Sequence, residues 1–111
     1  NNLTDAPQVC LDFMKQVPTT WDDVKLIDGY PGKYIVLARR HGQQWYVAAI
    51  NATKEPLKLD LQLPMLADKE VNFYSDAKDL EPQMKTQVVK KGRAKITLQP
   101  NGGAVWVQTS K

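Results

Sequence analysis

The alternation of apolar and polar positions is clearest in residues 57–63, where leucines occupy every second position and Lys, Asp and Gln stand between them. A period of two places the leucines on one face of a β-strand and the polar side chains on the other. Pro56 and Pro64 bracket the segment, as expected where a strand begins and ends. The pattern predicts a half-buried strand with one face in a core and one face in water.

Two other segments, residues 33–40 and 44–51, are apolar at most positions on both sides of the predicted strand. Both are rich in β-branched and aromatic residues, and His41-Gly42-Gln43 between them is typical of a hairpin loop in which glycine takes a positive φ. Strands that are apolar on both faces lie in the middle of a sheet that is covered on each side. We therefore expect residues 33–51 to form two central strands.

The remaining β segments are short and separated by turn residues. We expect a hairpin of residues 84–90 and 93–99 about Lys91-Gly92, and a closing strand over residues 103–109 after Pro100-Asn101-Gly102. Two more short strands are predicted at 24–28 and 71–74. The sum is an all-β fold, an antiparallel β-sandwich of about eight strands.

One helix is predicted before the strands, over residues 6–17. Pro7 suits a first helical turn, and Pro18 ends the helix because it cannot continue the hydrogen-bond pattern. The helix has an apolar stripe that must pack against this sandwich or against a preceding domain. The stripe follows helical spacing and consists of Ala6, Val9, Cys10, Phe13, Met14 and Val17.

Length and composition fit one compact domain. A chain of 111 residues has room for a single core. No apolar run approaches the roughly 20 residues that span a bilayer, so no membrane association is predicted. Cys10 is the only cysteine, which excludes an internal disulfide and a cysteine-based zinc site. The chain starts at Asn1 without a signal peptide, and we expect a fragment of a longer protein.

The net charge of +3 is concentrated in the last third of the chain. A basic cluster can bind nucleic acid, or it can be the solvated tip of a hairpin whose charges discourage aggregation. No aromatic residues that could stack on bases are interspersed with these charges, so we favour the hairpin tip and expect no nucleic-acid partner. The cluster consists of Lys90, Lys91, Arg93 and Lys95.

Four sequence motifs occur in a characteristic order: VPTTWDD at 17–23, DGYPG at 28–32, ARR at 38–40 and WYV at 45–47. This ordered combination resembles the junction and first hairpin of the C-terminal domain of glycoside hydrolase family 97. The similarity covers residues 5–63 well, and the remainder only as a β pattern.

The resemblance implies a longer enzyme in which an N-terminal β-sandwich and a central (β/α)8 barrel precede this domain. It implies that the barrel holds the catalytic glutamates and bound calcium, that the substrates are α-glucosides or α-galactosides, and that the protein is periplasmic or extracellular in a bacterium. No catalytic position of the family maps onto this chain. We therefore expect no catalytic residue, metal site or cofactor in it.

Asp22 and Asp23 are the one adjacent pair of carboxylates near this junction. Glycoside cleavage needs two carboxyl groups about 5–10 Å apart on opposite sides of one bond, whereas neighbouring side chains diverge. We interpret the pair as part of a turn in which Asp caps backbone N–H groups. His41, the sole histidine, is expected to be a surface loop residue, because no nucleophile and orienting carboxylate accompany it.

Trp21 and Tyr30 differ from the other aromatic residues because they lie in a connector and a turn, where no strand pattern demands burial. Sugar rings stack on Trp and Tyr, and apolar residues of connectors also serve interfaces between domains. We favour contact with a neighbouring domain over contact with a sugar. These two residues are the candidate carbohydrate or interdomain contacts of the chain.

Three functions follow from these observations. The favoured one is a non-catalytic domain, residues 24–111, that packs against the catalytic barrel and stabilises it, with residues 1–23 as the last barrel helix and the connector. The second is a carbohydrate-binding module that holds oligosaccharide through exposed aromatic residues. The third, an independent enzyme that uses Asp22 or Asp23, is the least favoured.

Overall fold

The computed structural model describes residues 20–77 and 82–109, together with Pro7, Val9, Cys10, Asp12, Lys15 and Pro18. The described chain forms eight β-strands and two short 3-10 turns. The strands are β1 (Asp23–Tyr30), β2 (Tyr34–His41), β3 (Gln44–Asn51), β4 (Leu57–Gln62), β5 (Glu70–Asp76), β6 (Pro82–Val88), β7 (Arg93–Leu98) and β8 (Gly103–Gln108), and the turns are η2 (Pro64–Leu66) and η3 (Lys90–Gly92).

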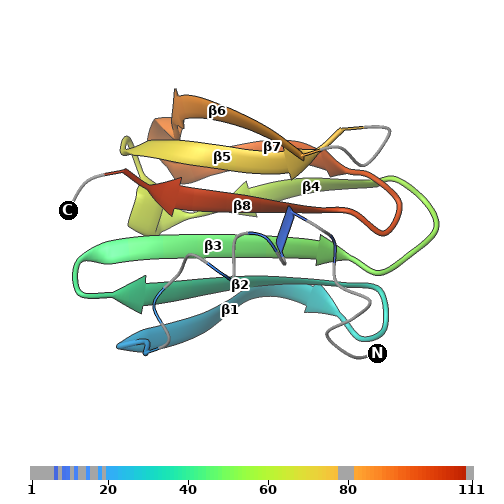
Figure 1. Cartoon of the computed structure of the whole chain (residues 1–111), viewed down its shortest axis with the longest axis horizontal. Helices are drawn as coiled ribbons and strands as arrows, with labels where there is room; N and C mark the ends of the chain where they lie inside the picture. The colour runs from blue at the N-terminus through green and yellow to red at the C-terminus, as the bar shows by residue number, and fades with distance from the viewer. Residues whose placement is uncertain are drawn as a thin grey trace.

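The strands form two sheets of unequal size, and all strand pairs are antiparallel. Six strands form one sheet in the order β1-β2-β3-β8-β5-β6, and β4 pairs with β7 in a second sheet. The small sheet lies across one side of the large one (Figure 1). The predicted all-β antiparallel fold is confirmed, and each predicted strand matches an observed one to within two residues at either end.

The core lies between the two sheets. Leu59 and Leu61 of β4 are buried while Lys58 and Asp60 are exposed, as the alternation predicts. Trp106 of β8, in the six-stranded sheet, is fully buried in this core. Its ring centroid lies 5.0 Å from that of Phe73. We call the face of the large sheet that contacts this core the inner face.

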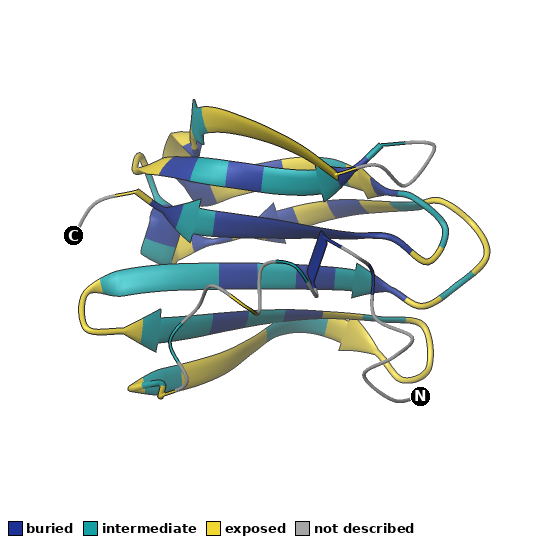
Figure 2. Ribbon diagram, viewed as in Figure 1, coloured by how far each residue is buried: buried dark blue, intermediate teal, exposed yellow. Residues whose placement is uncertain are grey.

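The other face of the six-stranded sheet, the outer face, is partly covered by residues from the start of the chain. Val9 and Cys10 are each 3% exposed and form a second small cluster with Val105 of β8, against which Ala48 and Ile50 also pack. Figure 2 shows β8 buried along nearly its whole length. β8 is therefore covered on both faces. The sequence predicts such covering for β2 and β3, but Ile35 of β2 is 39% exposed on the outer face.

The helix predicted over residues 6–17 is not supported. Most of its residues lie outside the described part, in which no helix of seven residues or more occurs. Val9, Cys10 and Asp12 have helical backbone, but Lys15 lies in an exposed turn. Helices shorter than about 12 residues are marginal in water without extensive burial, and Pro7, Val9 and Cys10 are the buried residues of the described part of this segment.

The hairpin predicted about Lys91-Gly92 is wrong. β6 pairs with β5 at the edge of the six-stranded sheet, whereas β7 pairs with β4 in the other sheet. The turn η3 carries the chain from one sheet to the other, with φ of 55° at Lys91 and 72° at Gly92. Instead, β7 alternates buried and exposed residues as β4 does, and these two strands pair with their buried residues on one face.

Candidate functional site

The connector that leads into β1 is held on the hairpin between β2 and β3. The N–H of Gly42 donates to Oδ2 of Asp22 (2.7 Å), and the N–H of Asp22 donates to the carbonyl of Arg40 (2.8 Å). The Nδ1 atom of His41 lies 3.0 Å from the carbonyl oxygen of Thr20. Asp22 thus accepts a backbone N–H as predicted, but the donor lies 20 residues away in the β2–β3 hairpin instead of in a local turn, and Asp23 is the first residue of β1.

Trp21 packs on the outer face of the six-stranded sheet. Its ring meets the ring of Tyr46 edge-on with centroids 5.2 Å apart, and the guanidinium of Arg39 lies 5.5 Å from its centroid. Tyr46 and Arg39 are direct partners across β2 and β3, and directly paired residues share one face. Trp21 is half-buried, and its contacts fix the connector to the domain.

Tyr30 lies at the far end of β1 and is 57% exposed. It pairs with Tyr34, which packs against the main core, so Tyr30 is on the inner face. The ammonium group of Lys33 lies 5.8 Å from the centroid of its ring. Trp21 lies over Arg39, and Tyr30 pairs with Tyr34 five residues further back along β2, so at about 3.3 Å per residue the two aromatic residues lie about 16 Å apart along the sheet. Because they also lie on opposite faces, the two aromatic residues cannot stack on the same sugar.

Asp76 lies where the first residues of the chain meet the sheet, so that the Val9 backbone and the Asp12 charge both affect its pKa. Its Oδ2 atom accepts a hydrogen bond from the N–H of Gly103 (2.9 Å), and the residue is 8% exposed. Burial raises the pKa of Asp76, opposed by the Gly103 N–H, and the charge of Asp12 raises it further. Burial, with a smaller effect of the Asp76 charge, raises the pKa of the Cys10 thiol to about 12.

The basic cluster is spread over the crossing between the sheets. The guanidinium of Arg93 donates two hydrogen bonds to the carboxylate of Asp60, 3.0 and 2.7 Å long. The backbone N–H of Lys91 donates to Oδ1 of Asp68 (2.9 Å). These contacts give the cluster a structural role in the turn and in the pairing of β4 with β7.

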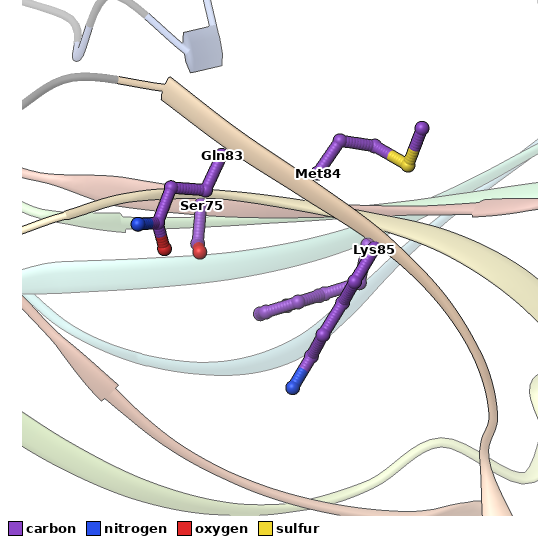
Figure 3. Close-up of a pocket in the computed structure, with 5 residues that line it drawn as sticks. Ser75, Gln83, Met84 and Lys85 are labelled. Atoms are coloured by element: carbon purple, nitrogen blue, oxygen red, sulfur yellow. The ribbon is translucent and has the colours of Figure 1, made fainter.

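A shallow open pocket of about 480 Å³ lies beside β5 and β6. Its lining is Phe73, Ser75, Gln83, Met84 and Lys85. In Figure 3, Met84 leaves its strand on the side away from Ser75, Gln83 and Lys85. The lining offers one cation and two neutral polar groups, without the paired carboxylates that glycoside hydrolysis requires.

Apolar side chains on the outer face are a feature that the sequence reasoning missed. Leu26 is 67% exposed and Met84 is 55% exposed, which is unusual for large apolar residues in a folded domain. Val24, Ile35 and Val88 are exposed on the same face. In the sequence, this surface is indicated only by apolar residues at alternate positions of β1. Whether they face the core or the solvent becomes clear only once the neighbouring strands are known.

Among the described residues, no group of three or more His, Cys, Asp or Glu side chains is placed to hold a metal ion. No helix in the described part of the chain is long and apolar enough to cross a membrane.

Two bacterial proteins are similar in sequence to this chain. The chain is 32% identical over 100 residues to a retaining alpha-galactosidase of Bacteroides thetaiotaomicron, a match that covers 82% of this chain and 15% of that protein. A probable retaining alpha-galactosidase of Streptomyces bingchenggensis is 35% identical over 60 residues, covering 50% of this chain and 9% of the relative. The chain therefore spans a small part of these relatives.

Solved structures share the fold. The crystal structure of a beta-arabinopyranosidase is 54% identical and superposes with a TM-score of 0.82, covering 97% of this chain and 17% of the other. A glycoside hydrolase family 97 enzyme from Pseudoalteromonas sp. strain K8, in complex with acarbose, superposes with a TM-score of 0.73 at 23% identity, covering 88% of this chain and 17% of the other.

Residues 20–108 match the family described as glycosyl-hydrolase 97 C-terminal, oligomerisation. This match covers most of the chain and includes all eight strands. The chain belongs to the family of C-terminal oligomerisation domains of glycoside hydrolase family 97.

Proposed function

We propose that this chain is a non-catalytic domain of a longer glycosidase and that it packs against and stabilises the catalytic (β/α)8 barrel of the same polypeptide. The proposal is supported by the match to the glycosyl-hydrolase 97 C-terminal oligomerisation family, and by the comparison in which this chain covers only 15% of the Bacteroides alpha-galactosidase. The chemistry agrees with it, because the carboxylate of Asp22 is occupied by the N–H of Gly42. Residues 1–23 would then join the barrel to the sandwich.

The substrate of the longer enzyme would be an α-galactoside or the corresponding arabinopyranoside. The relatives include alpha-galactosidases and a beta-arabinopyranosidase, the latter 54% identical to this chain. β-L-Arabinopyranose has the ring configuration of α-D-galactopyranose and lacks its exocyclic hydroxymethyl group, so one barrel pocket can favour either sugar according to the space around that group. α-Glucosides are a weaker candidate, because their 4-hydroxyl has the opposite configuration.

The calcium implied by the family resemblance would belong to the barrel. The described residues of this chain do not fit it, since they offer no cluster of three or more potential ligands. Export to the periplasm or the cell exterior would be directed by the longer protein.

The test compares this chain with the full-length protein on 4-nitrophenyl α-D-galactopyranoside, β-L-arabinopyranoside and α-D-glucopyranoside. We expect the full-length protein to hydrolyse one of the first two and this chain to hydrolyse none. Hydrolysis by this chain that is lost in Asp22→Asn would contradict the proposal.

Sugar binding is the alternative function, and the exposure of Tyr30 favours it. Affinity electrophoresis in galactan and arabinan gels tests it with Tyr30→Ala and Trp21→Ala. Retardation that is lost in Tyr30→Ala would establish a carbohydrate-binding role. Unretarded migration of the parent chain would leave the packing role.

A further inference from the structure

The solvent side of the two-stranded sheet consists of polar side chains. The buried residues of β4 and β7 point to the core, so the exposed residues that alternate with them point to solvent. Three of these exposed residues are cations and one is an anion, and we call this surface the cationic face. Its residues form three cross-strand pairs: Lys58 with Thr97, Asp60 with Lys95, and Gln62 with Arg93.

The cations of this face stand in a line. Arg93 and Lys95 are two residues apart on β7, and Lys58 lies on β4 diagonally across from Lys95. At about 3.3 Å per residue and about 4.8 Å between strands, the Cα atoms of neighbouring cations are about 7–8 Å apart. All three residues are exposed, so their charged groups can be reached by a partner.

Asp60 holds this line together without cancelling its charge. Its carboxylate accepts two hydrogen bonds from the guanidinium of Arg93, 3.0 and 2.7 Å long, and Lys95 is its direct partner across the strands. The hydrogen bonds from Arg93 lower the pKa of Asp60, and the charge of Lys95 adds to this effect. Three cations and one carboxylate leave the face with a net positive charge.

Two further exposed lysines continue the positive charge at one end of the face. Lys90 and Lys91 lie in η3, which leads directly into Arg93. The backbone N–H of Lys91 donates to Oδ1 of Asp68 (2.9 Å) and fixes this turn beside the sheet. A partner therefore meets charges on an ordered backbone, which reduces the conformational entropy lost on binding.

We propose that the cationic face binds a polysaccharide that carries carboxylate groups, and that it thereby keeps the longer enzyme close to polymeric substrate. The inference rests on the proposed function, which makes the longer protein a glycosidase. Carboxylates repeated along a sugar chain form a line of negative charges, complementary to the line of Lys and Arg side chains. Trp21 and Tyr30 take no part in this site.

The position of the face leaves it accessible in a longer protein. Val9 and Cys10 pack on the outer face of the six-stranded sheet, against Val105. β4 and β7 cover the inner face, so their solvent side points in the opposite direction (Figure 1). The polypeptide that precedes this domain is therefore attached on the far side of the sandwich from the cationic face.

The residues of the face favour a sugar polymer over other polyanions. Single-stranded nucleic acids are held largely by bases that stack on aromatic rings, and this face has no aromatic residue. Binding to an anionic membrane gains strength from apolar side chains, but the large exposed apolar residues among those described lie on the six-stranded sheet. Gln62 and Thr97 lie beside the cations and can form hydrogen bonds with sugar hydroxyl groups.

The experiment measures binding of this chain and of the full-length protein to immobilised polygalacturonate by biolayer interferometry. Its sugar has the galacto configuration of the proposed substrate, and fully methyl-esterified polygalacturonate supplies the same backbone without charge. We expect both proteins to bind the charged polymer only. The double variant Lys58→Glu and Lys95→Glu should bind at least about fivefold more weakly. Raising the salt from about 50 to about 200 mM should weaken binding about tenfold, because bound counterions are released.

The matched control is the double variant Lys33→Glu and Lys85→Glu, which changes the net charge equally at two exposed lysines of the six-stranded sheet and its turns. It should bind as the parent does. Equal losses in the two double variants would show adsorption by net charge and overturn the proposal. A variant that fails to fold, as judged by circular dichroism, is replaced by Lys58→Gln and Lys95→Gln.

Three other outcomes would also overturn the proposal. They are no binding to polygalacturonate, equal binding to its methyl ester, and binding to vesicles of anionic phospholipid in place of the polymer. Hydrolysis of the 4-nitrophenyl glycosides by the full-length parent is measured separately. Failure of the proposed function and failure of the cationic face therefore give different results.

Discussion

Trp106 is the largest fully buried side chain among the described residues, and its indole N–H has no hydrogen-bond partner among them. It packs on Phe73 in the middle of the main core. The ring thus contributes through apolar contact, while its polar atom is desolvated without compensation.

We predict that Trp106→Ala lowers the free energy of unfolding by about 3–5 kcal/mol, because it opens a cavity in the core. Trp106→Phe should cost much less, since it keeps most of the apolar contact and removes the unpaired N–H. Urea unfolding followed by circular dichroism measures both. Equal losses for the two substitutions would contradict this account of the site.

Asp76 gives a prediction about pH. Its pKa is raised by burial, so the folded state binds a proton at pH values where the unfolded state has released it. Stability from this group is present below its unfolded pKa of about 3.9 and is lost as the pH rises through the folded value. Asp76→Asn, which keeps an acceptor for the Gly103 N–H, should therefore gain stability relative to the parent chain as the pH rises above about 4.

Asp60 is the control with the opposite sign. The hydrogen bonds from Arg93 lower the pKa of Asp60, so its contribution is present above about 3.9 and is lost as the pH falls through the folded value. Asp60→Asn should change the pH dependence in the acid range only. Thermal unfolding of both variants from pH 3 to 8 tests these signs, and a shift of Asp76→Asn toward lower stability at neutral pH would refute the first.

Single residues differ in how far the sequence predicts them. The sequence predicted that Asp22 accepts a backbone N–H, but not that the donor is Gly42, 20 residues away in the β2–β3 hairpin. The role of Asp76 depends on Gly103, which is distant in sequence and adjacent only after β5 and β8 pair. Similarly, Trp21 could be placed in a connector, but its partner Tyr46 could not be named without the fold.

At the scale of elements, the turn between β6 and β7 carries the strictest backbone requirement. Gly92 has a φ of 72°, and an added Cβ would lie 2.8 Å from the carbonyl oxygen of Leu63. Gly42 in the β2–β3 hairpin has a similar φ of 62°, with nothing within 4 Å of an added Cβ. Substitution of Gly42 would therefore introduce backbone strain alone, whereas substitution of Gly92 would add steric overlap to it.

We predict that Gly42→Ala costs about 1–2 kcal/mol, the strain of a left-handed backbone in a residue with a side chain. Gly92→Ala should cost at least about twice as much, because the new Cβ would also overlap the carbonyl oxygen of Leu63. That oxygen belongs to the backbone and cannot move aside as a flexible side chain can. Chemical denaturation of the two variants provides the comparison. Equal costs would show that the crossing adjusts freely.

Strand positions were predictable because each strand carries its own apolar pattern. The pairing of the strands was harder to predict. Lys91-Gly92 is typical of a hairpin turn, so it suggests that the strands on either side of it pair with each other. Ala94 and Leu98 alternate with charged and polar residues as the leucines of β4 do, and this matching predicts the observed partner. The hairpin prediction was wrong because the turn at Lys91-Gly92 is a weaker indicator of pairing than the matching alternation of β4 and β7.

At the scale of the whole molecule, the attachment of the first residues to the sheet depends on the absence of a side chain at Gly103. An added Cβ there would lie 2.8 Å from the carbonyl oxygen of Ala49, 3.0 Å from Sγ of Cys10 and 3.2 Å from Pro7. Cys10 is thus a reporter of this attachment.

We predict that the thiol of Cys10 is alkylated at pH 8 at least about 100-fold more slowly in the folded chain than in denaturant, because burial raises its pKa to about 12. Gly103→Ala should accelerate alkylation by displacing the segment, whereas Gly42→Ala should not. Iodoacetamide labelling followed by mass spectrometry measures these rates. Fast labelling of the unmodified folded chain would exclude the described attachment.

β8, the last of the eight described strands, lies between β3 and β5 in the six-stranded sheet and pairs with both. During synthesis, β1–β3 can pair in order, and β5 can pair with β6, but the two halves have no common strand until residues 103–108 emerge. Until then β3 and β5 both present unpaired edges, which favour association between chains. The six-stranded sheet thus cannot be completed before β8 is synthesised, and premature termination before Gly103 would release a product prone to aggregate.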